Sequence, residues 1–451
     1  MSVEPYREIT FDKDGDGPPG QASALAGLAR QGVSDLVLFA HGWNSSPSGA
    51  TRLCSDFFAP FPGLLAPGVE AGYAGVIWPS MMFTDEPVPD YRALVRVLPE
   101  KEPVLDRLTE LLVTAPAEES AFAEFGALLR ELTDLAPDGG REVAAGAGER
   151  VPEFLVADPV EVCARFTEAV EATEGARAEG FGEGLKRYWK GAREVLRQAT
   201  YYVMKKRAGQ VGELGLGPLL GEVSRAAPGL RVHLVGHSMG ARLVAYALKG
   251  LPTGARPVAS VTLLQGAFSH YAFAARLPHD AGRSGSLRDV RQRVRGPVVA
   301  CYSRHDTALG VMYPLASRLV GDSASIGAER PGAEGLGAGG LGAEGLGAEP
   351  AGRSGAAPSG TAPSGAGPSG ASGGAPAGLL GVGDPRWGAI GHDGVQAVPG
   401  TVVRTLATVL RQGVPASGCV NVDVADVVRS HGDVCRPELA RVVVSASRTG
   451  R

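Results

Sequence analysis

Cysteine is scarce in this chain, which has five, odd in number, widely spaced and without a C-x-x-C pair. This usage argues against a disulfide framework and a structural zinc site, and it fits a reducing compartment. The sequence also lacks the roughly 20 consecutive apolar residues of a membrane span. Its first residues, MSVEPYREITF, have neither the basic nor the apolar part of a secretory signal. We therefore expect a cytoplasmic protein.

An excess of positive charge is also absent, because the formal net charge is −4 at pH 7. Nucleic acid is therefore not an expected partner, since binding it through bulk charge needs a basic surface. Hydrophobic residues make up 44% of the chain and charged residues 20%, values close to the globular average. A chain of 451 residues with this composition can bury a large core.

Glycine is the one residue in clear excess, and much of the excess lies in one segment. Residues 327–378 contain 18 glycines and 6 prolines among 52 positions, with recurring GLGAEG and PSG units and no aromatic residue. Such a segment buries too little apolar surface to offset its ordering entropy. We predict a disordered insert here.

Outside this insert, strand-like and helix-like segments alternate. Several strand candidates are continuous apolar runs, which is typical of strands covered on both faces in a parallel sheet. The alternation predicts an α/β fold with a mostly parallel central sheet flanked by helices. The seven expected strands are 7–11, 35–40, 74–78, 230–235, 259–264, 297–302 and 419–424.

Residues 85–215 differ from this pattern, because they lack clear strands and contain amphipathic helical stretches. We predict a helical cap inserted into the core. Its last part, Lys186–Arg207, is basic, and it is either a cationic face for an anionic surface or a solvated helix face; the second is the commoner case. The expected organisation is core 1–84, cap 85–215, core with nucleophile and acid 216–326, insert 327–378 and core with the base 379–451.

The strongest motif is G-x-S-x-G at Gly236–Gly240, with Ser238 at its centre. Short motifs arise by chance, and Gly370–Gly374 in the insert also matches. Only Ser238 follows an apolar strand and precedes an amphipathic helix, which is the setting a nucleophile elbow needs. Gly236 and Gly240 would let strand and helix approach closely around a strained serine. The backbone N–H of Met239 is then a candidate oxyanion donor.

A second motif, His41-Gly42-Trp43, follows the apolar strand 35–40 and precedes a small polar loop. With both motifs in place, the chain resembles the α/β-hydrolase superfamily, and several phrases (YYVMKKRAGQVG, LLQGAFSHYAF, RWGAIGHDG) are similar to uncharacterised actinobacterial members. The resemblance covers roughly 30–84, 225–326 and 415–451. It implies that the backbone N–H of Trp43 is the second oxyanion donor.

The resemblance also implies the order serine, acid, histidine, with acid and base in loops after late strands. Asp306 follows the strand 297–302 and is the favoured acid. Asp423 and Asp426 are weaker rivals, because they lie in or beside the last strand.

His431 lies between the last strand and the last helix and is the favoured base; His392 is its rival. His41, Trp387 and His392 are candidate pocket residues. No metal and no organic cofactor is expected.

These residues lead to a functional hypothesis, a serine hydrolase acting on a small acyl substrate, most readily a carboxylic ester. The alternative is a non-catalytic binding or scaffold protein with the same fold, since fold alone does not establish function. A third hypothesis is contact with an anionic lipid surface through Lys186–Arg207.

Overall fold

The computed structural model describes residues 1–43, 46–80, 91–134, 153–174, 184–306, 308–312 and 385–450. The predicted insert 327–378, with its second G-x-S-x-G match, lies outside these residues. So do the first residues of the predicted cap.

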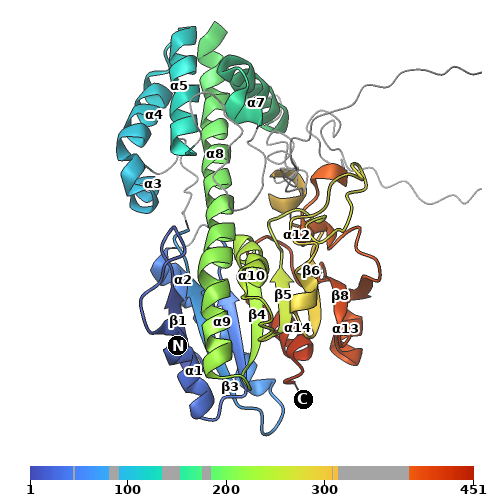
Figure 1. The fold of residues 1–451 in the computed structure, drawn as a ribbon. Coiled ribbons are helices and arrows are strands. Elements are labelled where there is room, and N and C mark those ends of the chain that lie inside the picture. Colours follow the sequence, from blue (N-terminus) through green and yellow to red (C-terminus); the bar gives the residue numbers. More distant parts are fainter. Residues whose placement is uncertain are drawn as a thin grey trace, which may run out of the picture. The chain divides into compact units, whose positions relative to one another are not determined.

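The described part of the chain builds one eight-stranded sheet in the order β1-β3-β2-β4-β5-β6-β8-β7, and all its pairings are parallel (Figure 1). This confirms the predicted α/β class and parallel sheet. All seven expected strands are present. The strands are β1 (Tyr6–Thr10), β2 (Asp35–Ala40), β3 (Ala71–Ile77), β4 (Arg231–His237), β5 (Val258–Leu264), β6 (Pro297–Tyr302), β7 (Val402–Thr405) and β8 (Gly418–Asp423).

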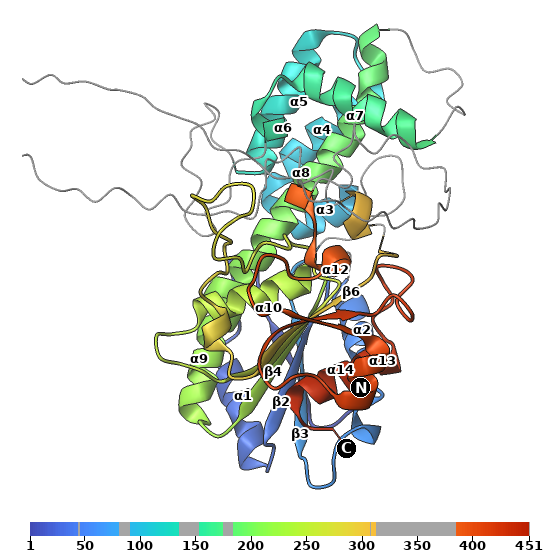
Figure 2. The same ribbon diagram turned by 90° about the vertical axis from the view of Figure 1, so that its right-hand side faces the viewer.

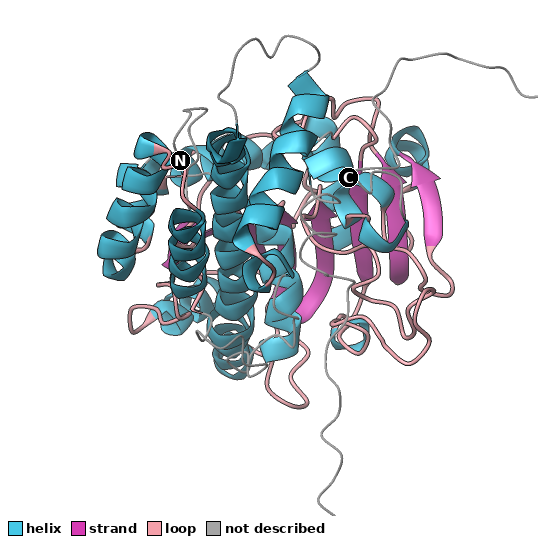
Figure 3. Cartoon of the chain, turned by 90° about the horizontal axis from the view of Figure 1, so that it is seen from above, coloured by secondary structure: helices cyan, strands magenta, loops and turns pink. Residues whose placement is uncertain are grey.

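The central strands are apolar throughout because both faces of the sheet are covered. In β2, Leu36 and Leu38 belong to one hydrophobic cluster, while Val37 and Phe39 belong to the other. Successive strand side chains point to opposite faces, so a run such as DLVLFA supplies both clusters. Figure 3 shows helices on both sides of the strands.

Two sets of helices cover the sheet. Buried residues of α1 (Gln21–Arg30), α9 (Gly217–Ala226) and α10 (Met239–Gly250) pack in the first cluster. Those of α2 (Pro47–Phe58), α13 (Leu406–Gln412) and α14 (Pro437–Ser447) pack in the second. Figure 2 shows α1, α9 and α10 apart from α13 and α14.

Most of the predicted cap is helical, as expected from its amphipathic pattern. Its described helices are α3 (Tyr91–Val97), α4 (Glu102–Thr114), α5 (Glu119–Leu132), α6 (Glu153–Val156), α7 (Pro159–Glu174) and α8 (Trp189–Gln210). Trp189 is central to their packing, because its ring stacks on Phe122 at 4.4 Å between centroids and lies edge-on to Phe125. The short helix α12 (Ile390–Asp393) follows much later in the chain.

The helix α8 belongs to both the cap and the core. It continues through a π-helical turn, Val211–Leu216, into α9, so the predicted boundary between residues 215 and 216 falls inside one helical stretch. The guanidinium Nε of Arg242 on α10 donates to the carbonyl of Lys205 on α8 at 2.9 Å. A Cβ added to Gly212 would lie 2.2 Å from the carbonyl oxygen of Leu243, so only glycine allows this approach.

The basic residues of 186–207 do not share one exposed face. Lys205 and Arg207 are both 4% exposed. The Arg207 guanidinium donates to the carbonyls of Pro79 and Val97 at 3.2 and 3.3 Å. This arginine therefore bonds the backbone of both the predicted cap and the predicted core and faces away from solvent. Among the described residues, no helix is long and apolar enough to cross a membrane.

Candidate active site

The strand β4 ends in a strained elbow at Ser238. Its backbone has φ 56° and ψ −119°, and α10 begins at the next residue. A positive φ is costly for a residue with a Cβ and is often retained at functional sites. A Cβ on Gly236 would lie 2.3 Å from the Gly240 carbonyl oxygen, and a Cβ on Gly240 would lie 2.2 Å from that of Ala40. The two glycines therefore permit the close approach that the motif predicts.

The three residues singled out as nucleophile, base and acid are brought together. The hydroxyl of Ser238 lies 2.8 Å from Nε2 of His431, and Nδ1 of His431 lies 2.7 Å from Oδ2 of Asp306. The second carboxylate oxygen of Asp306 accepts the backbone N–H of Leu309 at 3.1 Å. An ionised Asp306 accepts the proton of Nδ1, so Nε2 of a neutral His431 accepts the serine proton.

Strand topology explains why residues so distant in sequence meet. Ser238, Asp306 and His431 follow β4, β6 and β8, whose carboxyl ends lie at one edge of the parallel sheet. The helices after β2 and β4 pack in different clusters, so the loops leaving these neighbouring strands diverge. Such a switch point is where open α/β sheets form a crevice.

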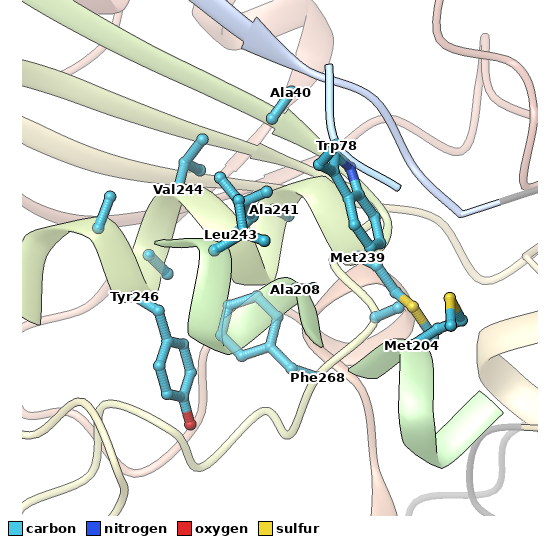
Figure 4. Packing of buried hydrophobic residues seen from close by; sticks show 14 of the residues in the cluster. Ala40, Trp78, Met204, Ala208, Met239, Ala241, Leu243, Val244, Tyr246 and Phe268 are labelled. Atoms are coloured by element: carbon cyan, nitrogen blue, oxygen red, sulfur yellow. The ribbon is translucent and has the colours of Figure 1, made fainter. Parts of the chain in front are cut away.

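One predicted oxyanion donor, Met239, directly follows Ser238, and the loop that contains the other, Trp43, passes close to Ser238 at Gly42. Met239 is the first residue of α10, and its N–H has no acceptor within the helix. A Cβ added to Gly42, next to Trp43, would lie 3.0 Å from the Cβ of Ser238. The Met239 side chain packs beside Trp78 and Met204, which places α8 against the elbow (Figure 4).

His41 bonds the loop that contains it. Its Nδ1 donates to the carbonyl of Gly42 at 2.7 Å, and its Nε2 faces the N–H of Trp78 at 3.4 Å. The indole N–H of Trp78 donates to the His41 carbonyl at 3.0 Å. Burial lowers the pKa of His41 to about 4, so the ring is neutral near pH 7. The predicted pocket residue thus fixes the shape of the Gly42 loop.

His392 lies near the acid but pairs with a different carboxylate. Its Nδ1 lies 2.7 Å from Asp393, whose other oxygen is 3.0 Å from Nδ1 of His270. The hydrogen bond with Asp393 raises the pKa of His392, against an opposing effect of burial. The described contacts of Ser238 include His431 and no bond to His392. In geometric terms, His431 and not the rival His392 occupies the position of the base.

The remaining candidates lie apart from this hydrogen-bond chain. Asp423 accepts the backbone N–H of Ala425, two residues along, at 3.0 Å. The indole N–H of Trp387 is buried and has no hydrogen-bond partner among the described residues. No group of three His, Cys, Asp or Glu in the described ranges is arranged to hold a metal ion.

Two features were missed by the sequence reasoning. Gln265 directly follows β5 and bonds the backbone of His431. The rule that singled out Asp306, a polar residue just after an apolar strand, would have found it.

A second serine–histidine–aspartate chain also exists at the amino ends of the strands. His233 lies 2.8 Å from the Ser260 hydroxyl through Nδ1 and 2.9 Å from Asp35 through Nε2.

No protein-family model, curated protein or solved structure matches this chain. The geometry and chemistry of the residues themselves therefore carry the functional argument.

Proposed function

We propose that this chain is a serine hydrolase with the α/β-hydrolase fold, acting on an acyl substrate. The observation that carries the proposal is the hydrogen-bond chain Ser238–His431–Asp306, with its serine on a strained turn at a helix start. Ordinary packing does not require a left-handed serine whose hydroxyl faces an imidazole.

The proposed reaction begins with attack of the Ser238 oxygen on the acyl carbonyl carbon, while Nε2 of His431 takes the hydroxyl proton. Asp306 holds the imidazole in the required tautomer and stabilises its charged form. The backbone N–H groups of Met239 and Trp43 stabilise the oxyanion. His431 then protonates the leaving group, and a water activated by the same nitrogen releases the acyl group and regenerates the serine.

Carboxylic esters are the substrates we favour. Thioesters and amides would use the same groups, but an ester carbonyl is more reactive than an amide carbonyl and demands less of the oxyanion donors. The side chains packed beside the elbow, Met239, Trp78 and Met204, are apolar and buried, so the surroundings of Ser238 suit an apolar acyl group better than a charged one.

A fluorophosphonate probe followed by mass spectrometric mapping tests the proposal. We expect one adduct, on Ser238, that disappears in Ser238→Ala and is strongly reduced in His431→Ala. An adduct elsewhere, or no adduct on protein shown to be folded, would contradict it.

One observation favours the second candidate, a non-catalytic binding protein: Ser238 is only 1% exposed. A binding protein has no use for an accessible nucleophile. The same labelling experiment separates the two candidates, because a hydrolase must admit the probe to Ser238. If folded protein stays unlabelled even with the smallest phosphonates, the binding function is favoured.

A further inference from the structure

Gln265 combines features that are individually unfavourable. It follows β5, is 0% exposed, and has a left-handed backbone with φ 44°. Its side-chain Nε2 donates to two main-chain carbonyls, that of His431 at 3.0 Å and that of Ser430 at 3.3 Å. Because both acceptors are carbonyl oxygens, the amide nitrogen and not the amide oxygen must face them.

A second donor reaches the same carbonyl. Nε2 of His237 lies 2.8 Å from the His431 oxygen, and the two imidazole rings are 5.0 Å apart between centroids. A carbonyl can only accept, so Nε2 of His237 is protonated. Burial, together with a smaller effect of the neighbouring His431, lowers the pKa of His237 to about 3. His237 is therefore a neutral donor at physiological pH.

The arrangement leaves two acceptors unsatisfied. Oε1 of Gln265 and Nδ1 of His237 are both buried without a hydrogen-bond partner among the described residues. An unsatisfied buried polar group costs about 1–3 kcal/mol, and a left-handed non-glycine residue adds strain. These unfavourable free energies fall on two residues that bond the same carbonyl, which indicates that the arrangement has a functional role.

The neighbouring strands β4 and β5 end in the same way. Both end in a left-handed residue other than glycine, Ser238 after β4 and Gln265 after β5. Ser238 bonds the imidazole of His431, and Gln265 bonds its backbone. Both the imidazole and the backbone of His431 are thereby bonded to residues at the carboxyl ends of these two strands.

We propose that Gln265 and His237, here called the donor pair, are positioning residues that set the His431 imidazole at bonding distance from Ser238. The proposal rests on the proposed hydrolase function. The loop around His431 has two further braces: Asp433 accepts the N–H groups of Arg429 and Ser430, and the Arg429 side chain lies 2.8 Å from Nε2 of His305. The donor pair alone ties the His431 carbonyl to the elbow and to β5 among the described contacts.

Removal of one donor should therefore affect chemistry more than stability. Gln265→Met keeps the volume, removes the donor and also removes the unsatisfied Oε1, while His237 still satisfies the carbonyl. We expect a free energy of unfolding near that of the wild type and phosphonate labelling of Ser238 slowed about 10- to 100-fold, the range for small misplacements of reacting groups. Gln265→Glu places a carboxylate against two carbonyl oxygens and should slow labelling further.

The matched control is Gln198→Met on α8. This change also removes a buried side-chain amide, but that amide donates to Glu194 on the same helix and bonds no residue of the hydrogen-bond chain at Ser238. It should leave the labelling rate unchanged. A role in loop stability alone predicts the opposite pattern for Gln265→Met: lower stability, with normal labelling of the molecules that remain folded.

The decisive readout is the low-field proton resonance of the His431–Asp306 hydrogen bond, compared in wild type and Gln265→Met. Slower labelling of folded Gln265→Met together with a shifted or broadened resonance supports the donor pair. A labelling rate within twofold of wild type, or an unaltered resonance, overturns it. If wild type itself is not labelled, the hydrolase function fails, and the resonance alone then decides whether the donor pair positions His431.

Discussion

Two serine–histidine–aspartate chains lie in one sheet, and only one has the surroundings that the proposed function requires. Ser238, His431 and Asp306 lie at the carboxyl edge, in loops and at a helix start. The second chain, Ser260–His233–Asp35, lies within the strands near their amino ends. The heavy-atom distances differ by no more than about 0.2 Å between the two chains. Residue types and hydrogen bonds therefore do not by themselves make a nucleophile.

The backbone accounts for the difference. Ser260 lies inside β5, paired in register with His233, and no helix begins after it. Its side chain has neither a strained turn to project from nor a free helix N–H beside it. The use of the ring nitrogens is also reversed, since His233 meets its serine through Nδ1 and its carboxylate through Nε2.

Charge and burial separate the two chains further. Both acids are fully buried, but Asp35 has two further side-chain donors, since Arg231 and Ser34 donate to its second oxygen at 2.6 and 2.7 Å. Burial opposes its ionisation, but these bonds and that of His233 lower the pKa of Asp35 to about 2. His233 is 1% exposed, whereas the side chain of His431 is 23% exposed. The second chain, here called the inner chain, is thus enclosed in the sheet, while the chain of Ser238, here called the outer chain, is partly exposed at His431.

The largest contrast should come from the same substitution at the two acids. Asp306→Asn leaves the geometry but lets His431 adopt the wrong tautomer, so phosphonate labelling of Ser238 should slow by about 10⁴-fold. Asp35→Asn should leave the labelling rate of folded protein unchanged. Equal loss in both variants would remove the distinction between the chains.

A second contrast concerns stability. His233→Ala leaves a buried carboxylate without one of its donors and opens a cavity, so it should lower the free energy of unfolding by about 3–5 kcal/mol. His431→Ala also removes a donor from a buried carboxylate, Asp306, but the partly exposed His431 leaves no enclosed cavity, so it should cost less, about 1–3 kcal/mol. Urea denaturation of both variants measures the difference, and a larger loss in His431→Ala would reverse our assignment.

Asp35, the acid of the inner chain, should also make the stability of the protein depend on pH. Its pKa is lowered from 3.8 to about 2 in the folded protein. Folding therefore favours the ionised form, and this stability is fully present above the unfolded pKa and lost as pH falls through the folded one. Denaturation midpoints measured from pH 5 to pH 2 should fall more steeply in wild type than in Asp35→Asn. Parallel curves would show that Asp35 contributes nothing in this range.

The smallest expected effect is that of Ser260→Ala. It removes one neutral hydrogen bond to His233 and should cost about 1 kcal/mol. Labelling of Ser238 should continue at the wild-type rate, measured on the same preparation. Any slowing would mean that the two chains are coupled through β4, which contains His233 and leads into Ser238.

The sequence indicated the outer chain because each of its residues follows an apolar strand, a local and readable signal. The inner chain depends on strand register, because His233 meets Ser260 and Asp35 only after β2, β4 and β5 pair. To predict the role of Gln265, one would also have to know that the end of β5 lies beside the loop after β8. The strand β7 was missed because its four residues, VVRT, are mostly exposed at the edge of the sheet.

The helical stretch Trp189–Ala226 determines how this chain could be recombined with others. If residues 85–215 were exchanged as a module, the junction would fall inside this helical stretch, and side chains of another protein would pack against α10. At Gly212, any larger residue would meet the Leu243 carbonyl and displace the helix that follows Ser238. A functional chimera should exchange only the helices before Met204, so that the native contact surface of α8 stays with its own elbow.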